Sequence, residues 1–209
     1  RRVLFRSLVL TESESAAIRP FTPWEGSTVP PQAQIRGLDG ARMTLRSRTA
    51  TEELLSRTMG LERLAEEGGA VRWGRRDSAK QESAGSGTRL DLVERPELPR
   101  GAWGTGAVHH LAWRVDDLDH ELELRSAIDQ AGHRPTPVID RFWFRSVYFK
   151  EPGGVLFELA TDGPGFAVDE APGHLGESLV LPPWLESERP AIESALPVLA
   201  PASADRSRK

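Results

Sequence analysis

The chain has 209 residues, of which 38% are hydrophobic, and it carries a formal charge of −4. This length suits one sizeable domain or two small ones, and no apolar run is long enough to cross a membrane. The acidic balance and the lack of a basic stripe argue against nucleic acid as the main partner. The absence of cysteine excludes disulfides and thiolate metal sites, so any metal must be held by histidine or oxygen ligands. We expect a soluble, cytoplasmic protein.

Residues 1–34 precede the first predicted unit. Residues 1–7 lack the apolar core and cleavage site of a signal peptide, and they resemble the translation of a sequencing adapter. We therefore predict an artefactual leader, with an ordinary basic N-terminus as the alternative. Residues 8–34 are interpreted as the end of a missing preceding module, with Leu8-Val9-Leu10 as the stump of a strand, followed by a proline-rich linker. The natural protein is then expected to be longer.

The first predicted unit covers residues 35–95. A strand at 38–46 is followed by Thr49 and Glu52, a capping-box pair that predicts a helix running to Met59 and ending at Gly60. Three short strands are expected at 61–64, 70–73 and 88–93, with a polar, glycine- and serine-rich loop before the last of them.

The second predicted unit covers residues 96–165 and repeats the same order. A strand at 108–115 precedes a helix that follows Asp116-Asp117, carries Leu118, Leu122 and Ile128 near one face, and ends at Gly132. Strands are expected around 136–143, 144–150 and 155–160, and residues 166–209 form a tail. An internal repeat of about fifty residues indicates units that pack together. We predict an α+β fold in which paired βαβββ modules form a curved, partly open, mixed β-sheet cup.

One carboxylate stands out in the apolar strand 155–160. Glu158 follows a Pro-Gly-Gly turn, and an ionised glutamate among apolar neighbours is costly unless it is paired or bound to a metal. His110 lies in the strand 108–115 and is the candidate partner. A core histidine bonded to a carboxylate is the alternative to a metal site. The equivalent positions of the first unit fall on Gly40 and Asp91, so any metal chemistry belongs to the second unit.

Several motifs together resemble a known family. They are Val-His-His-Leu-Ala-Trp-Arg-Val at 108–115, Asp-Arg-Phe-Trp-Phe-Arg-Ser-Val-Tyr-Phe at 140–149, Glu-Pro-Gly-Gly-Val-Leu-Phe-Glu at 151–158, and the tail 181–186. The chain resembles the hydroquinone-cleaving branch of the extradiol dioxygenases in the vicinal oxygen chelate superfamily, which also contains glyoxalases and bleomycin resistance proteins. The resemblance implies that fold and the Fe(II)-dependent cleavage by O2 of hydroquinone- or catechol-like rings. Mn(II) is an alternative metal because it accepts the same ligands.

The resemblance also implies a ligand set of two histidines and one glutamate. His110 and Glu158 match the second histidine and the glutamate, and His109, Arg141 and Tyr148 match catalytic positions around the substrate. Each catalytic residue has a plainer interpretation. Tyr148 is then an ordinary strand aromatic, Arg141 pairs with Asp140 or caps a hairpin, and His109 orients its neighbour.

The first histidine of the family lies on the opening strand of an N-terminal unit that we expect this chain to lack. The chain is thus interpreted as the C-terminal part of a dioxygenase, weak in metal binding and inactive by itself. His120 and His133 are expected to be solvated, and His174 is a weak third-ligand candidate. Two other functions remain open: a different metal-dependent, glyoxalase-like enzyme, and a metal-free module that binds an aromatic small molecule. Self-association through an exposed sheet edge also remains open.

Overall fold

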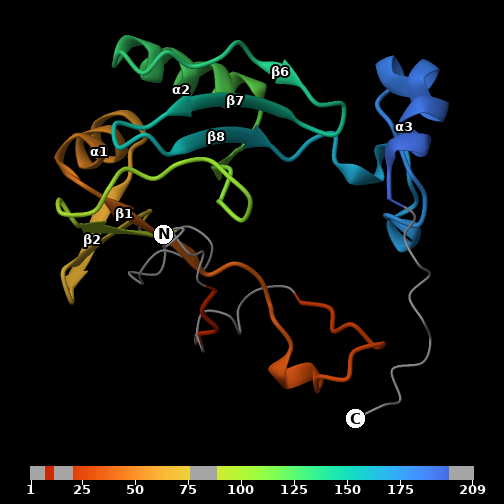
Figure 1. Cartoon of the computed structure of the whole chain (residues 1–209), viewed down its shortest axis with the longest axis horizontal. Helices are drawn as coiled ribbons and strands as arrows, with labels where there is room; N and C mark the ends of the chain where they lie inside the picture. Colours follow the sequence, from red (N-terminus) through yellow and green to blue (C-terminus); the bar gives the residue numbers. More distant parts are fainter. Residues whose placement is uncertain (1–7, 12–20, 76–88, 198–209) are drawn as a thin grey trace.

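The computed structural model describes residues 8–11, 21–75 and 89–197, and it contains two four-stranded sheets (Figure 1). The first sheet has the order β1-β4-β3-β2, and its strands are β1 (Gly40–Leu45), β2 (Glu62–Glu67), β3 (Ala70–Gly74) and β4 (Arg89–Glu94). The second has the order β5-β8-β7-β6, with β5 (Leu111–Val115), β6 (Ile139–Asp140), β7 (Arg145–Lys150) and β8 (Leu156–Thr161). In each sheet the first strand pairs in parallel with the last, and the other pairs are antiparallel. The repeated topology confirms the predicted α+β fold of paired βαβββ modules with open, mixed sheets.

Each unit carries one helical segment between its first two strands. In the first unit this is α1 (Thr49–Glu53), which continues as the π-helical turn η3 (Leu54–Thr58). In the second unit it is α2 (Leu118–Gln130), which lies on one side of β7 and β8 (Figure 1). The remaining elements are short: the 3₁₀ turns η2 (Pro31–Ala33), η4 (Phe166–Val168), η5 (Pro172–His174) and η6 (Pro183–Glu188), and the final helix α3 (Arg189–Ala195). No helix in the described part of the chain is long and apolar enough to span a membrane.

The helix starts differ in how far local sequence determines them. For α2, the Asp117 side chain accepts a hydrogen bond from the backbone N–H of His120 at 2.9 Å, as expected of an acidic N-cap. The capping box predicted at Thr49 is wrong, because Arg48 occupies the N-cap position and no side chain caps it. The backbone N–H of Arg48 donates instead to Glu94 Oε2 at 3.0 Å, so the end of β4 fixes where α1 begins.

Two predicted strands differ from the observed ones. Strand β5 begins at Leu111, so His109 and His110 lie just before it. Strand β6 has two residues, because Phe142 has a positive φ of 72° and turns the chain directly into β7. Leu8, Val9 and Leu10 are 77–91% exposed and pair with no described strand; because the predicted stump was expected to pair with strands outside this chain, it stays a prediction. The predicted leader and most of the predicted loop before β4 lie outside the described residues.

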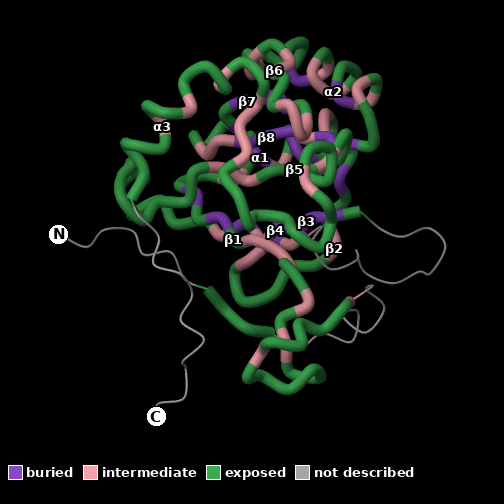
Figure 2. Tube along the Cα trace, turned by 90° about the vertical axis from the view of Figure 1, so that its right-hand side faces the viewer, coloured by how far each residue is buried: buried purple, intermediate pink, exposed green. Residues whose placement is uncertain are grey.

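One hydrophobic core runs through both units (Figure 2, purple). The first unit contributes residues such as Leu55, Val71 and Leu92, and the second contributes Phe157 and Leu159 of β8 among others. Each sheet packs one face against its helical segment, and α2 also contacts η3. The opposite face of each sheet is more polar, with Asp91 in the first sheet and Glu158 in the second.

A buried carboxylate joins the two units at the turn between β7 and β8. Glu151 is 2% exposed and accepts hydrogen bonds from the backbone N–H groups of Gly153 and Val155, at 2.9 and 2.8 Å. It also accepts one at 2.6 Å from the hydroxyl of Thr51, which lies 100 residues earlier in α1. The carboxylate therefore holds the turn that leads into β8, the strand that carries Glu158.

Candidate metal centre

His110 and Glu158 meet on the open face of the second sheet. Ala112 of β5 pairs with Glu158 of β8, so a side chain two residues before Ala112 lies on the same face, close to the glutamate. The structure places His110 Nε2 2.8 Å from Glu158 Oε2. The histidine side chain is 33% exposed and the glutamate 5%, so one side of the pair is open to a ligand and the other is enclosed.

Tyr148 binds the second oxygen of the same carboxylate. It pairs directly with Glu158 across β7 and β8, and its hydroxyl donates to Glu158 Oε1 at 2.5 Å. The His110 and Tyr148 rings meet edge to face with centroids 5.8 Å apart. Both carboxylate oxygens thus have a partner, which explains how a strand of mainly apolar residues accommodates a buried glutamate.

Arg141 reaches this group from the turn before β7. Its guanidinium carbon lies 5.5 Å from the centroid of the Tyr148 ring, in cation–π geometry. Its Nε donates to the hydroxyl of Ser146, a fully buried residue of β7, at 3.4 Å. The alternative pairing with Asp140 is not formed among the described residues. The Asp140 carboxylate instead accepts from the backbone N–H of Phe142 at 2.7 Å.

His109 contacts the site through its neighbour. Its Nδ1 lies 2.8 Å from Nδ1 of His110, so one of the two nitrogens donates and the other accepts. Trp103, from the connection between the units, meets the His109 ring edge to face at 4.7 Å. This arrangement can fix the ring orientation and tautomer of His110. The structure therefore brings all five predicted site residues into one connected group.

The other histidines lie elsewhere. His120 Nδ1 is 3.4 Å from an Asp116 carboxylate oxygen, and His174 Nδ1 is 2.9 Å from Glu177 Oε2 in the exposed tail. Within residues 8–11, 21–75 and 89–197, no group of three or more His, Cys, Asp or Glu side chains is arranged to hold a metal ion. His174 therefore does not complete the pair formed by His110 and Glu158.

Glu121 is a buried carboxylate that the sequence analysis missed. It lies on the inward face of α2 at 0% exposure, and neither of its oxygens has a hydrogen-bond partner among the described residues. Burial raises the pKa of the Glu121 carboxyl; the charge of Arg145 opposes this rise and that of Glu158 adds to it. Helical spacing from Glu121 to Leu124 and Ile128 could have revealed it. The sequence pattern predicted Leu122 on this inward face; that prediction is wrong, because Leu122 is 44% exposed.

The first unit places a different group at the equivalent position. Asp91 pairs with Arg42 of β1 and Arg72 of β3, just as Glu158 pairs with Ala112 and Tyr148. Gly40 lies two residues before Arg42, where the second unit has His110. The register thus confirms the predicted correspondence, and it shows two arginines around the first carboxylate.

No family model matches the chain. Among curated proteins, it is 41% identical over 174 residues to MhqO of Bacillus subtilis, named a "putative ring-cleaving dioxygenase", covering 83% of this chain and 53% of that protein. It is 32% identical over 172 residues to a chlorohydroquinone/hydroquinone 1,2-dioxygenase of Sphingobium indicum, covering 79% of this chain and 50% of that enzyme. The chain thus spans about half the length of the curated relatives that it matches.

Solved structures agree with this result. A structure from Bacillus subtilis, named a "putative dioxygenase", superposes with a TM-score of 0.76 at 40% identity, over 85% of this chain and 55% of that one. A glyoxalase/bleomycin resistance protein/dioxygenase domain from Frankia shares the fold at 13% identity, with a TM-score of 0.51 over 64% of this chain and 97% of that one. By sequence, the chain is related to proteins named as ring-cleaving dioxygenases, and it shares its fold with a glyoxalase/bleomycin resistance protein/dioxygenase domain.

Proposed function

We propose that the chain carries part of the active site of an Fe(II)-dependent, extradiol-type dioxygenase that cleaves hydroquinone- or catechol-like rings with O2. The observation that carries this proposal is the Glu158 carboxylate, which is shared between the imidazole of His110 and the hydroxyl of Tyr148. The relatives support the reaction class, and one of them is named for hydroquinone.

The donor set fits a ferrous ion. His110 Nε2 and Glu158 Oε2 are a nitrogen and an oxygen ligand from adjacent strands, and Fe(II) and Mn(II) both accept such ligands. The two atoms lie 2.8 Å apart in a hydrogen bond, and both would serve as ligands to a bound metal, in exchange for the shared proton. A further protein ligand comes from outside the described residues. When bound, the metal would act as a Lewis acid toward a phenolic oxygen and would pass electron density to O2.

The surrounding side chains have distinct roles in this proposal. The Tyr148 hydroxyl points at the carboxylate, and it exchanges a proton with a substrate hydroxyl bound beside it. The Arg141 guanidinium lies over the Tyr148 ring and places a positive charge beside the substrate, where it stabilises a bound phenolate. His109 is a positioning residue, because it contacts His110 and not the carboxylate.

Anaerobic calorimetry with Fe(II) tests the ligand assignment. The His110→Ala and Glu158→Gln variants should each weaken binding at least tenfold, because each removes a direct ligand, and losses of roughly 10–100-fold follow even from changes behind a ligand. The matched control is His120→Ala, a histidine paired with Asp116 outside the site. Unchanged affinity in both site variants contradicts the proposal.

Oxygen uptake with hydroquinone tests the reaction, measured in a version of the protein that carries the complete ligand set and turns over. At saturating metal, the Tyr148→Phe variant should lose rate, because it removes the proton-exchanging hydroxyl and keeps the ring; saturation is needed because Tyr148 also binds the proposed ligand Glu158. Equal uptake by Tyr148→Phe and the unmodified protein excludes the proton role.

A metal-free binding module is the second candidate. It is favoured by the small ligand set, since the described residues supply two ligands and no third. Its distinguishing result is saturable binding of an aromatic diol that a chelator leaves unchanged.

A further inference from the structure

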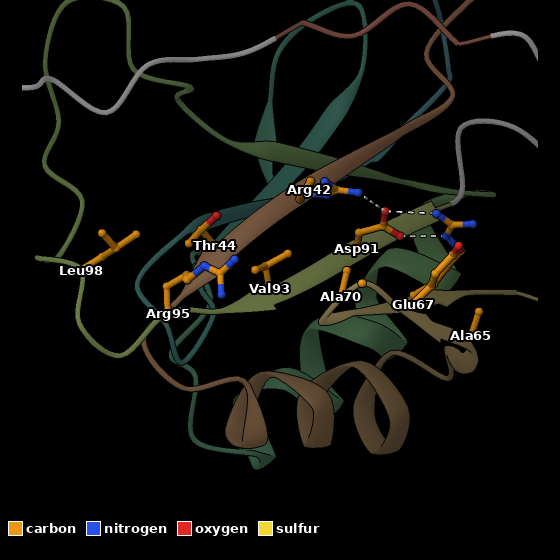
Figure 3. A pocket seen from close by; sticks show the side chains of 11 residues that line it. Arg42, Thr44, Ala65, Glu67, Ala70, Asp91, Val93, Arg95 and Leu98 are labelled. Atoms are coloured by element: carbon orange, nitrogen blue, oxygen red, sulfur yellow. Dashed lines mark hydrogen bonds and ion pairs between the residues drawn. The ribbon is translucent and has the colours of Figure 1, made fainter.

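The open face of the first sheet contains a pocket of about 490 Å³ (Figure 3). Its charged side chains are Arg42 of β1, Glu67 of β2, Arg72 of β3, Asp91 of β4 and Arg95, which directly follows β4. Ala70 and Val93 contribute to an apolar floor, and Leu98 of the following turn closes one end. This face is the counterpart of the face that carries Glu158 in the second unit, but its chemistry differs.

The Asp91 carboxylate in this pocket is already paired with two arginine side chains. Arg72 donates to both of its oxygens, at 2.8 and 3.2 Å, and Arg42 lies 3.3 Å from one of them. Burial alone would raise the pKa of the Asp91 carboxyl, but the hydrogen bonds and charges of Arg72 and Arg42 hold it below its usual range. A metal ion would have to displace two guanidinium groups, so this pocket does not repeat the metal chemistry of the second unit.

The net charge of the side chains that line the pocket is positive. Three arginines line the pocket against two carboxylates, Asp91 and Glu67. Arg42 offers further N–H groups, because it has one contact with Asp91 and its side chain is 65% exposed. Arg95 directly follows β4 and lines the same pocket as Asp91, and its side chain forms no ion pair with any residue in the described part of the chain.

We propose that this pocket is a second binding site, for a small organic monocarboxylate with an apolar body. The Arg95 guanidinium binds the carboxylate, since it presents paired N–H donors that match the two oxygens. Thr44 of β1, which pairs with Val93 two residues before Arg95, adds a hydroxyl donor (Figure 3). Ala70, Val93 and Leu98 contact the body of the ligand. This site is independent of the metal and of the proposed ring cleavage.

The test uses benzoate as the probe, with benzamide as its uncharged analogue and inorganic phosphate as an oxyanion without an apolar body. Amide chemical shifts of the 209-residue chain are followed during each titration, and affinities are measured by calorimetry. We expect saturable benzoate binding, with shifts confined to β1, β3, β4 and the turn at Leu98. Benzamide and phosphate should bind at least about tenfold more weakly, which is the effect of losing one charge-assisted hydrogen bond or the apolar contacts.

The Arg95→Gln variant should weaken benzoate binding about tenfold for the same reason. Its matched control is Arg114→Gln, which changes an exposed arginine on the second sheet and should leave the affinity unchanged. Both positions are exposed, so neither variant threatens folding. The proposal is overturned if benzoate does not saturate, if its shifts fall on β5–β8, if benzamide or phosphate binds as tightly, or if the two arginine variants behave alike.

Discussion

The hydrogen bond between Thr51 and Glu151 should be a major contributor to stability, and the Thr51→Val variant tests this. Thr51 is 0% exposed, and its hydroxyl donates to the buried carboxylate at 2.6 Å. Valine has nearly the same shape, so the variant removes the hydroxyl without opening a cavity. A hydrogen bond to a charged group contributes about 1.5–3 kcal/mol, and the carboxylate keeps only its two backbone donors. We expect a loss of about 2 kcal/mol in the free energy of unfolding.

Urea denaturation followed by circular dichroism gives this free energy. Thr49→Val is the matched control, because Thr49 is an exposed residue of the same helix whose side chain caps nothing. Its effect should stay within about 0.5 kcal/mol. The reasoning is refuted if Thr51→Val is no more destabilising than Thr49→Val.

A double-mutant cycle then isolates the bond between the two units. In Glu151→Gln the new amide N–H₂ must face at least one backbone N–H, since both carboxylate oxygens accept bonds, and we expect a loss of about 3 kcal/mol. The double variant should lose less than the sum of the two single variants, by about 1–2 kcal/mol. Simple additivity would mean that the hydroxyl and the carboxylate do not interact.

Three further predictions concern Glu121, Gly153 and Asp91. Glu121→Leu should stabilise the protein by about 1–3 kcal/mol at pH 7, because it removes an unpaired buried carboxyl, whereas Glu123→Leu on the exposed side of α2 should not. Folding raises the pKa of Glu121, so the contribution of Glu121 to stability is most favourable below the unfolded-state pKa and is lost as pH rises through the folded-state pKa. The stability gained from Glu121→Leu should therefore be smaller in thermal melts at acidic pH. Gly153→Ala should destabilise the fold in thermal melts, because a Cβ there would lie 2.5 Å from Leu45 Cδ2 and 2.7 Å from Glu151 Oε1. Folding lowers the pKa of Asp91, so its ion pairs should stabilise the protein above the unfolded-state pKa, and this stabilisation should be lost as pH falls through the folded-state pKa. The Asp91→Asn variant should not show this pH-dependent loss.

Local sequence patterns predicted the elements that local interactions determine. Asp117 and Gly132 bound α2 because an acidic N-cap and a glycine with a φ of 87° act within one turn of the chain. The proximity of His110 and Glu158 was predictable because strand alternation determines the face on which each side chain lies. The repeat then placed the two strands in one sheet.

Contacts between residues far apart in the sequence determine the features that local patterns did not predict. The start of α1 depends on Glu94, and the turn before β8 depends on Thr51, neither of which is near in sequence. The arginines around Asp91 come from two strands that neighbour it only in the folded sheet. Glu121 was missed for a related reason, since a carboxylate on the inward face of a helix contradicts the usual apolar pattern.

The parallel pairing of the first and last strands within each unit also bears on the order of folding. The β5–β8 pair joins partners far apart in the chain; the Arg114–Asp162 ion pair, for example, spans 48 residues. Such non-local pairs form slowly, because the entropic cost of closing a long loop precedes the stabilising contacts between the strands. A ribosome must therefore complete β8 before His110 can meet Glu158. If the pair holds a metal ion, as proposed above, ion uptake would report the completion of the second unit.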